Sequence, residues 1–212
     1  MLNMKTLKYF LPIIFLVTLT QASCSNDDDD VTTTTPVVAT LTQAEKDGLI
    51  QMREEEKLAR DVYLYSFDLY GKQIFTNISN SEQKHMDRIL ELLVTYNLPD
   101  PASTEIGVFN NPDLQKLYND LTALSKKSLL DALLVGTTIE DLDIYDLEEL
   151  IKTTNKSDIL LAYDNLNCGS RNHMRAYTSQ VIGEGGTYTV QFITDQRYQE
   201  ILAGDHEKCG SH

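Results

Sequence analysis

Prolines and glycines are few in this chain, and basic residues are outnumbered by acidic ones. Its 212 residues include five prolines, ten glycines, 18 lysines and arginines, and 32 aspartates and glutamates. With 42% apolar residues, this composition allows a packed core and is not typical of a disordered chain. The formal net charge of −14 argues against nucleic acid, or an anionic membrane face, as a partner.

The apolar run near the N-terminus is too short to cross a bilayer. It extends from Tyr9 to Leu19 behind two lysines, which is typical of a secretory signal peptide over residues 1–23. Cys24 follows Ala-Ser directly and resembles the lipid-acceptor cysteine of bacterial lipoproteins. The acidic "SNDDDD" after it resembles the export tag of Bacteroidetes-type lipoproteins. These resemblances imply an outer-membrane lipoprotein exposed at the cell surface, and the alternative is ordinary secretion with soluble release.

Strand patterns are nearly absent from the rest of the chain. The acidic and threonine-rich residues 24–40 predict a tether, residues 41–204 a folded domain, and residues 205–212 a frayed tail. In the domain, four long helices are expected at about residues 42–70, 79–96, 127–153 and 158–182. The second should begin at Ser79, because Ser79 and Glu82 have capping-box spacing.

A short helix from Pro112 to about Leu124 is expected between the second and third long helices, since Asn-Pro is a helix-start signature. Residues 187–193 favour a short extended segment, and residues 195–204 a last helical turn or two. The predicted fold class is therefore all-α, a four-helix bundle with one short inserted helix.

Each long helix places an acid or a histidine on its inward line. The candidates are Glu55 or Glu56, Glu82 with His85, Glu140 with Asp143, and His173. A buried carboxylate must pair, neutralise or bind a cation, and few lysines or arginines lie on these lines. Carboxylate oxygens and imidazoles suit iron, and residues three apart, such as Glu82 and His85, share a helical face. The pattern predicts a metal centre.

Each candidate has a simpler interpretation when it is taken alone. Glu82 has the position of a capping residue, and a lone buried histidine is more often a core residue than a ligand. The acids Asp141, Asp146, Glu148 and Glu149 favour a solvated helix face, and Tyr63, Tyr163 and Tyr177 favour core packing. The metal hypothesis rests on coincidence, since two of the four histidines fall on core lines beside acids.

Four fragments, "EEKLARDVY", "SEQKHM", "VGTTIEDLDIYDL" and "GSRNHMRAY", together resemble the ferritin-like domain-of-unknown-function family related to rubrerythrin. The resemblance covers about residues 41–202 and implies a ferritin-like bundle with a di-iron carboxylate centre. It favours Glu56 over Glu55, which periodicity alone slightly prefers, because Ala, Arg and Tyr follow Glu56 at the family's spacing. The implied ligands are Glu56, Glu82, His85, Glu140 and His173.

One ligand of that pattern is missing, because Ser170 stands where a glutamate should precede His173 by three residues. Asp143, three residues after Glu140, could replace it if its side chain faces inward. The centre would then hold two irons. With Asp143 outward, we expect one ion, a different metal such as manganese or zinc, or none.

The resemblance implies an envelope-anchored oxidoreductase that acts on O₂ or peroxide, or oxidises Fe(II). The alternative is a non-enzymatic surface bundle with structural metal or none, which binds a partner or cations. No Cys-x-x-Cys is present, so the chain has no rubredoxin-like electron relay. Cys168 and Cys209 predict a disulfide in an oxidising compartment, whereas the spacing of His206, Cys209 and His212 would suit a soft metal.

Overall fold

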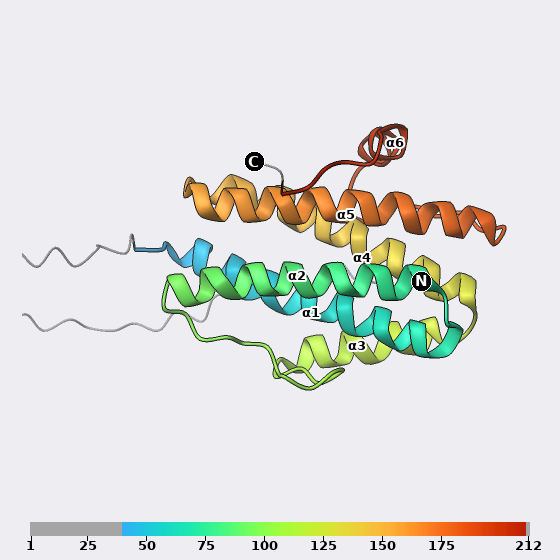
Figure 1. Ribbon diagram of the computed structural model, residues 1–212, viewed down its shortest axis with the longest axis horizontal. Coiled ribbons are helices and arrows are strands. Elements are labelled where there is room, and N and C mark those ends of the chain that lie inside the picture. The colour runs from blue at the N-terminus through green and yellow to red at the C-terminus, as the bar shows by residue number, and fades with distance from the viewer. Residues whose placement is uncertain (1–39, 211–212) are drawn as a thin grey trace, which may run out of the picture. The chain divides into compact units, whose positions relative to one another are not determined.

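The computed structural model describes residues 40–210, and all regular structure in this part of the chain is helical. The elements are α1 (Gln43–Tyr70), α2 (Gln73–Thr95), α3 (Pro112–Ser125), α4 (Leu129–Leu150), the 3₁₀ turn η2 (Ile151–Thr153), α5 (Ser157–Gly183) and α6 (Asp195–Ala203). Helices α1, α2, α4 and α5 form a bundle, with α3 packed on α1 and α4 and α6 beside α5 (Figure 1). The prediction of an all-α helical bundle is confirmed.

Three expectations from the sequence concern residues outside this range. The signal peptide, Cys24 and all but the last residue of the tether precede residue 40. Within residues 40–210, no helix has the length and apolar character that a membrane crossing requires.

The direction of each long helix follows from contacts between helix ends. Thr154, just after α4, donates a hydrogen bond to Glu45 in the first turn of α1, so α1 and α4 are antiparallel. Lys72, just before α2, pairs with Glu184, just after α5, so α2 and α5 are antiparallel too. Because a two-residue turn joins α1 to α2, α2 and α4 run parallel. The crossover of residues 96–128, which contains α3, makes this possible (Figure 1).

The ends of α1 and the start of α3 agree with the sequence prediction. Thr42 and Glu45 form a reciprocal capping box at the start of α1. Gly71 ends the helix with φ 62°, a left-handed conformation that costs glycine little. Asn111 caps α3 by accepting a hydrogen bond from the backbone of Asp113.

The predicted start of α2 at Ser79 is wrong. The helix begins six residues earlier, at Gln73, and its N-cap Lys72 makes no side-chain capping bond. The Ser79 hydroxyl instead donates to the carbonyl of Thr76 in the preceding turn. Glu82 is therefore a mid-helix residue, and the capping interpretation of it does not apply.

Buried charges hold the crossover on α1. The Lys57 side chain is completely buried and donates to Asp61 on α1 and to the carbonyl oxygen of Glu105. Asp61 also accepts a hydrogen bond from the backbone N–H of Gly107. This pairing explains how a lysine can lie inside the domain, because each buried charge has its partner.

The polar centre of the bundle lies between apolar layers. Toward the start of α1, the core contains Leu49, Met52, Leu93, Leu147 and Leu166 with their neighbours. Toward its end, the rings of Tyr63, Phe75 and Tyr177 pack together, with centroids 5.2 and 6.0 Å apart. The acids and histidines therefore occupy a middle section that apolar packing shields from both ends.

Asp141 was expected on a solvated acidic face, and that prediction is wrong. Its side chain is completely buried. Its carboxylate accepts hydrogen bonds from the Tyr188 hydroxyl and from the backbone N–H groups of Gln191, Phe192 and Ile193. Asp141 thus anchors the segment between α5 and α6, where the described chain has turns and no strand.

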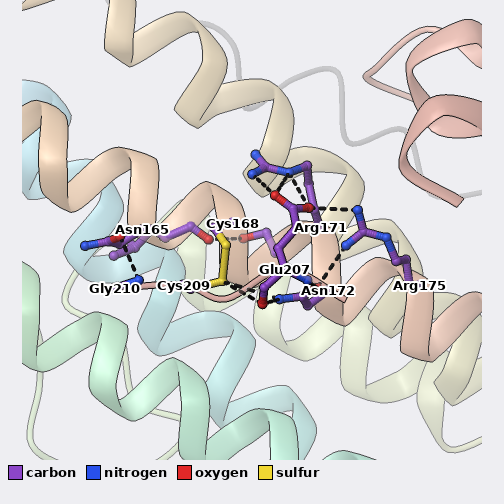
Figure 2. The surroundings of a disulfide bond; sticks show 10 residues. Asn165, Cys168, Arg171, Asn172, Arg175, Glu207, Cys209 and Gly210 are labelled. Atoms are coloured by element: carbon purple, nitrogen blue, oxygen red, sulfur yellow. Dashed lines mark hydrogen bonds and ion pairs between the residues drawn. A yellow bond between two sulfur atoms is a disulfide. The ribbon is translucent and has the colours of Figure 1, made fainter. Parts of the chain in front are cut away.

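The expectation of a frayed tail is also wrong for residues 205–210, which lie along α5 (Figure 2). The Glu207 carboxylate pairs with Arg171 and Arg175, and Cys209 is joined to Cys168 by a disulfide, with an S–S distance of 2.09 Å. This is the pair for which the sequence predicted a bridge. A Cys209 sulfur in this state is not a ligand for a soft metal, and His212 lies outside the described residues.

Candidate metal centre

Five side chains from the four long helices converge in the middle of the bundle. They form two groups, Glu56 with Glu82 and His85, and Glu82 with Glu140 and His173. Within each group, one possible ligand atom per residue lies within 4.8 Å of the others. The groups share Glu82, which therefore occupies the centre of the arrangement.

The two oxygens of Glu82 face different histidines. Its Oε2 lies 2.8 Å from His85 Nδ1, and its Oε1 lies 2.8 Å from His173 Nδ1. Each histidine also approaches a second acid: His85 Nδ1 is 3.1 Å from Glu56 Oε2, and His173 Nδ1 is 3.4 Å from Glu140 Oε2. The geometry describes two adjacent positions with one carboxylate between them.

Several buried atoms in these two groups, and one on the neighbouring Asp143, have no hydrogen-bond partner among the described residues. They are Glu56 Oε1, Glu82 Oε1, Glu140 Oε2, Asp143 Oδ2 and His173 Nδ1. The 2.8 Å approach of His173 Nδ1 to Glu82 Oε1 is short but lacks hydrogen-bond geometry, since both atoms remain unpartnered. Buried polar groups are rarely left so, and a cation between them would satisfy several at once. The donor set, carboxylates and imidazoles, fits such a metal.

Protons on the acids and histidines compensate part of the buried charge. Burial raises the pKa of Glu56 to about 7, although His85 opposes the change. Burial would lower the pKa of His85, but the charges of Glu56 and Glu82 outweigh it and raise that pKa to about 10. Burial acts to raise the pKa of Glu82 as well, yet His173 and His85 hold it below its usual value. Protonated imidazoles thus supply positive charge where metal ions would.

Comparison with known proteins places the chain in a family. Residues 45–205 match the model of the "Uncharacterized protein domain (DUF2202)" family. The chain belongs to this DUF2202 family. It is 51% identical over 169 residues to the uncharacterized protein MJ0754 of Methanocaldococcus jannaschii. The alignment spans 79% of this chain and 91% of that protein.

The crystal structure of the hypothetical protein MJ0754 is similar to the structure of this chain. The two have a TM-score of 0.77 at 46% identity, over 88% of this chain and 100% of the other. All five converging residues lie within the DUF2202 domain.

Asp143, the residue that could replace the missing glutamate, is buried in the DUF2202 domain with 2% exposure. Burial, followed by the charges of Glu56 and Glu140, raises its pKa well above the usual value. Its side chain therefore faces the same acidic interior, although it belongs to neither group of converging atoms. Ser170 is buried as well, and its hydroxyl donates to the carbonyl of Leu166.

Glu56, not Glu55, is the α1 residue in the converging set. Glu55 is also buried, at 4% exposure. The charged group that raises its pKa most is Asp146 on α4. The register taken from the family resemblance therefore describes this side chain better than hydrophobic periodicity does.

Two residues that sequence reasoning did not assign to the site support it. Tyr63, expected to be only a packing residue, donates its hydroxyl to Glu140 Oε1 at 2.6 Å. Gly169 lies against the His85 ring, because a Cβ at that position would be 2.6 Å from Cε1 and Nε2 of His85. The one sequence signal for Gly169 is its position one turn before His173.

Proposed function

We propose that this DUF2202 protein is a ferritin-like di-iron carboxylate protein, related to rubrerythrin, with oxidoreductase activity toward O₂, peroxide or Fe(II). The observation that carries the proposal is the position of Glu82, whose two oxygens each lie 2.8 Å from a different histidine. The single long crossover between α2 and α4 is also typical of ferritin-like bundles.

Each converging residue has a role in this proposal. His85 and Glu56 would hold one iron, His173 and Glu140 the other, and Glu82 would bridge them. Asp143 would supply the fourth carboxylate in place of the residue missing from α5. Two irons bound there would supply the exchange of electrons with an oxidant or with Fe(II).

The protein's own groups prepare the site for this chemistry. Tyr63 donates to one oxygen of Glu140 and leaves the other, which has no hydrogen-bond partner in the described part, directed at His173. Completely buried neighbours, including Tyr63 and Tyr177, whose rings pack at an interplanar angle of 52°, keep water away from this side of the centre.

A second candidate function is a non-enzymatic bundle with a structural metal such as zinc or manganese. Ser170 favours it, because it stands where the Glu-x-x-His motif of a di-metal bundle would supply the carboxylate of the fourth helix. The two proposals differ in redox behaviour. A structural site would bind metal and show no turnover with O₂, peroxide or Fe(II).

Metal analysis of protein purified without chelators tests the proposal. We expect about two iron ions per chain, as the ligand pattern of di-iron bundles requires, and consumption of O₂ or peroxide coupled to oxidation of the iron. Glu82→Gln should lose both metals, because it removes the shared ligand while keeping the side-chain shape. Glu91→Gln is the matched control, since Glu91 is exposed on the same helix and pairs with Arg88.

The outcomes separate the two functions. Bound metal without any redox turnover would support the structural role. Unchanged metal content in Glu82→Gln would overturn both, because the bridge would then have no part in binding.

The proposal places the protein at the outer membrane, exposed at the cell surface and anchored through a lipid on Cys24. The support is the sequence alone: a charged and apolar N-terminal segment, a cysteine after Ala-Ser, and the acidic stretch that follows it.

A further inference from the structure

A second set of acids lies next to the converging residues, between α1 and α4. On α4, Glu140, Asp143 and Asp146 follow one another at intervals of three residues. Each interval advances about 4.5 Å along the axis and turns the side chain by about 60°. The three acids therefore form a stripe that winds from the interior toward the surface.

Burial follows the winding of this stripe. Glu140 is 0% exposed and Asp143 2% exposed, whereas Asp146 is only partly buried. The carboxylates thus lead in steps from solvent to the centre.

Glu55 of α1 lies opposite the outer part of the stripe. Among the charged groups that act on it, Asp146 is the strongest, ahead of Glu56 and Glu54. Glu55 is 4% exposed, and its Oε2 has no hydrogen-bond partner among residues 40–210. Its other oxygen accepts one hydrogen bond, from Gln51.

A buried carboxylate oxygen without a partner, next to a second carboxylate, is costly in its charged form unless the group takes up a proton or a cation. Asp143 has the same property, because its Oδ2 is buried and unpartnered. Glu55 also acts on Asp143 electrostatically. Two orphaned oxygens on facing helices are independent signs that this interior receives a positive ligand.

We infer that Asp146, Glu55 and Asp143 form the path by which a hydrated divalent cation enters the metal centre. The inference rests on the proposed function. Asp146 would meet the cation at the surface, and Glu55 and then Asp143 would replace part of its water shell with carboxylate oxygens, the ligands that hard cations prefer. Asp143 ends the path, since it is also the fourth carboxylate of the proposed centre. Glu56 and Glu140 would then receive it. The path consumes nothing and changes no bond, apart from the exchange of metal ligands.

The competing entrance is on the opposite side, between α2 and α5. There the side chains of His85 and His173 are 12% and 10% exposed. A cation that enters there would not pass Glu55 or Asp146, so variants of these two residues distinguish the entrances.

The test is the rate of Co(II) uptake by metal-free protein, followed by stopped-flow absorbance. We expect Glu55→Gln and Asp146→Asn each to slow loading about tenfold, with the same final stoichiometry and spectrum as wild type. Glu149→Gln is the matched control, because it removes one negative charge from an exposed position on the same helix. It should load within about twofold of wild type, since exposed charges are well screened.

Each outcome bears on a different claim. Equal rates in Glu55→Gln, Asp146→Asn and the control would overturn the path and leave the centre intact. A lower final stoichiometry in Glu55→Gln would overturn it too, because Glu55 would then be a ligand. Failure of the wild type to bind Co(II) would overturn the proposed function itself. Thermal unfolding of each variant checks folding, and Asp146→Asn is the variant least able to disturb the core.

Discussion

At the scale of single residues, the same type of side chain has different roles within one turn of helix. Arg53, Glu54, Glu55 and Glu56 are all buried, yet only Glu56 reaches the converging set. Arg53 pairs with Asp100 of the crossover. Several acids of α1 are buried because other elements cover this helix on several sides. The role of each buried residue therefore depends on the side chain that it faces on the neighbouring element.

Gly169 offers a direct test of the space that the His85 ring needs. A Cβ at Gly169 would lie 2.6 Å from the ring, closer than atoms can approach, so Gly169→Ala should turn His85 out of position. Because a displaced ligand weakens a metal site, we expect metal affinity to fall about 10- to 100-fold. Titration with Co(II) measures this change.

Gly183→Ala is the control for that substitution. Gly183 ends the same helix, and a Cβ there would meet nothing within 4 Å. We expect unchanged metal affinity and equal or slightly higher stability, since alanine is the better helix former. Equal affinities in the two variants would show that His85 is not a ligand.

How far the site could be predicted depends on where the information lies along the chain. Glu82 and His85 share a face by local spacing alone, and sequence is sufficient for that. The inward position of Asp143 depends on the rotation of α4 against α1, which no local pattern encodes. The role of Gly169 depends on the ring of His85, 84 positions earlier in the chain. A glycine alone therefore does not indicate that another residue needs the space.

At the scale of elements, the starts of α1 and α3 were predictable from their side-chain caps, and the start of α2 was not. Thr42 and Asn111 are the N-caps of α1 and α3, and their side chains accept hydrogen bonds from the first turn of each helix. The start of α2 has no such bond, while Ser79 and Glu82 imitate a capping box within the helix. Asp141 was misjudged for a related reason, because its partners at residues 188–193 belong to a segment about 50 residues away.

The C-terminal segment provides a pH-dependent prediction for one element. Hydrogen bonds from Arg171, then from Arg175, lower the pKa of Glu207 to about 2, although partial burial opposes them. The unfolded carboxyl titrates near 4.5. The folded pKa is the lower one, so the contribution of Glu207 to stability is complete above about pH 4.5 and is lost as the pH falls toward 2.

Urea unfolding of Glu207→Gln and wild type, with the disulfide intact, measures this contribution. We expect a constant difference in unfolding free energy between pH 7 and about pH 5.5, and a smaller difference at pH 3. Glu200→Gln on α6 removes the same charge at an exposed position and corrects for the general effect of charge. A difference in unfolding free energy that increases as the pH falls would contradict a stabilising ion pair of Glu207 with Arg171 and Arg175 on α5.

At the scale of the whole molecule, the proposed lipid anchor makes a prediction about location. Cys24→Ser removes the thiol that would accept the lipid, so labelling with a radioactive fatty acid should disappear and the protein should leave the membrane fraction. Cys209→Ser, which removes a cysteine of the disulfide and leaves Cys24, controls for the loss of a thiol and should still be labelled. Labelled Cys24→Ser protein would refute the anchor.

Metal should also determine the stability of the bundle as a whole. The converging acids and histidines come from all four long helices, so the site exists only when these helices are packed together. A ligand that binds only the folded state stabilises that state. At a free-metal concentration of 1,000 times the dissociation constant, the gain is about 4 kcal/mol. For a domain of this size, that corresponds to a rise of roughly 8–16 °C in Tm.

Calorimetry of wild type and Glu82→Gln, each with Co(II) and with chelator, measures this rise. We expect the shift in wild type and almost none in Glu82→Gln, because the bridge between the two positions is lost. Glu91→Gln should behave as wild type, since the Glu91 carboxylate is exposed, pairs with Arg88 and belongs to neither group of converging residues. An equal shift in wild type and Glu82→Gln would mean that Co(II) binds elsewhere. The acids at the centre of the bundle would then need another explanation.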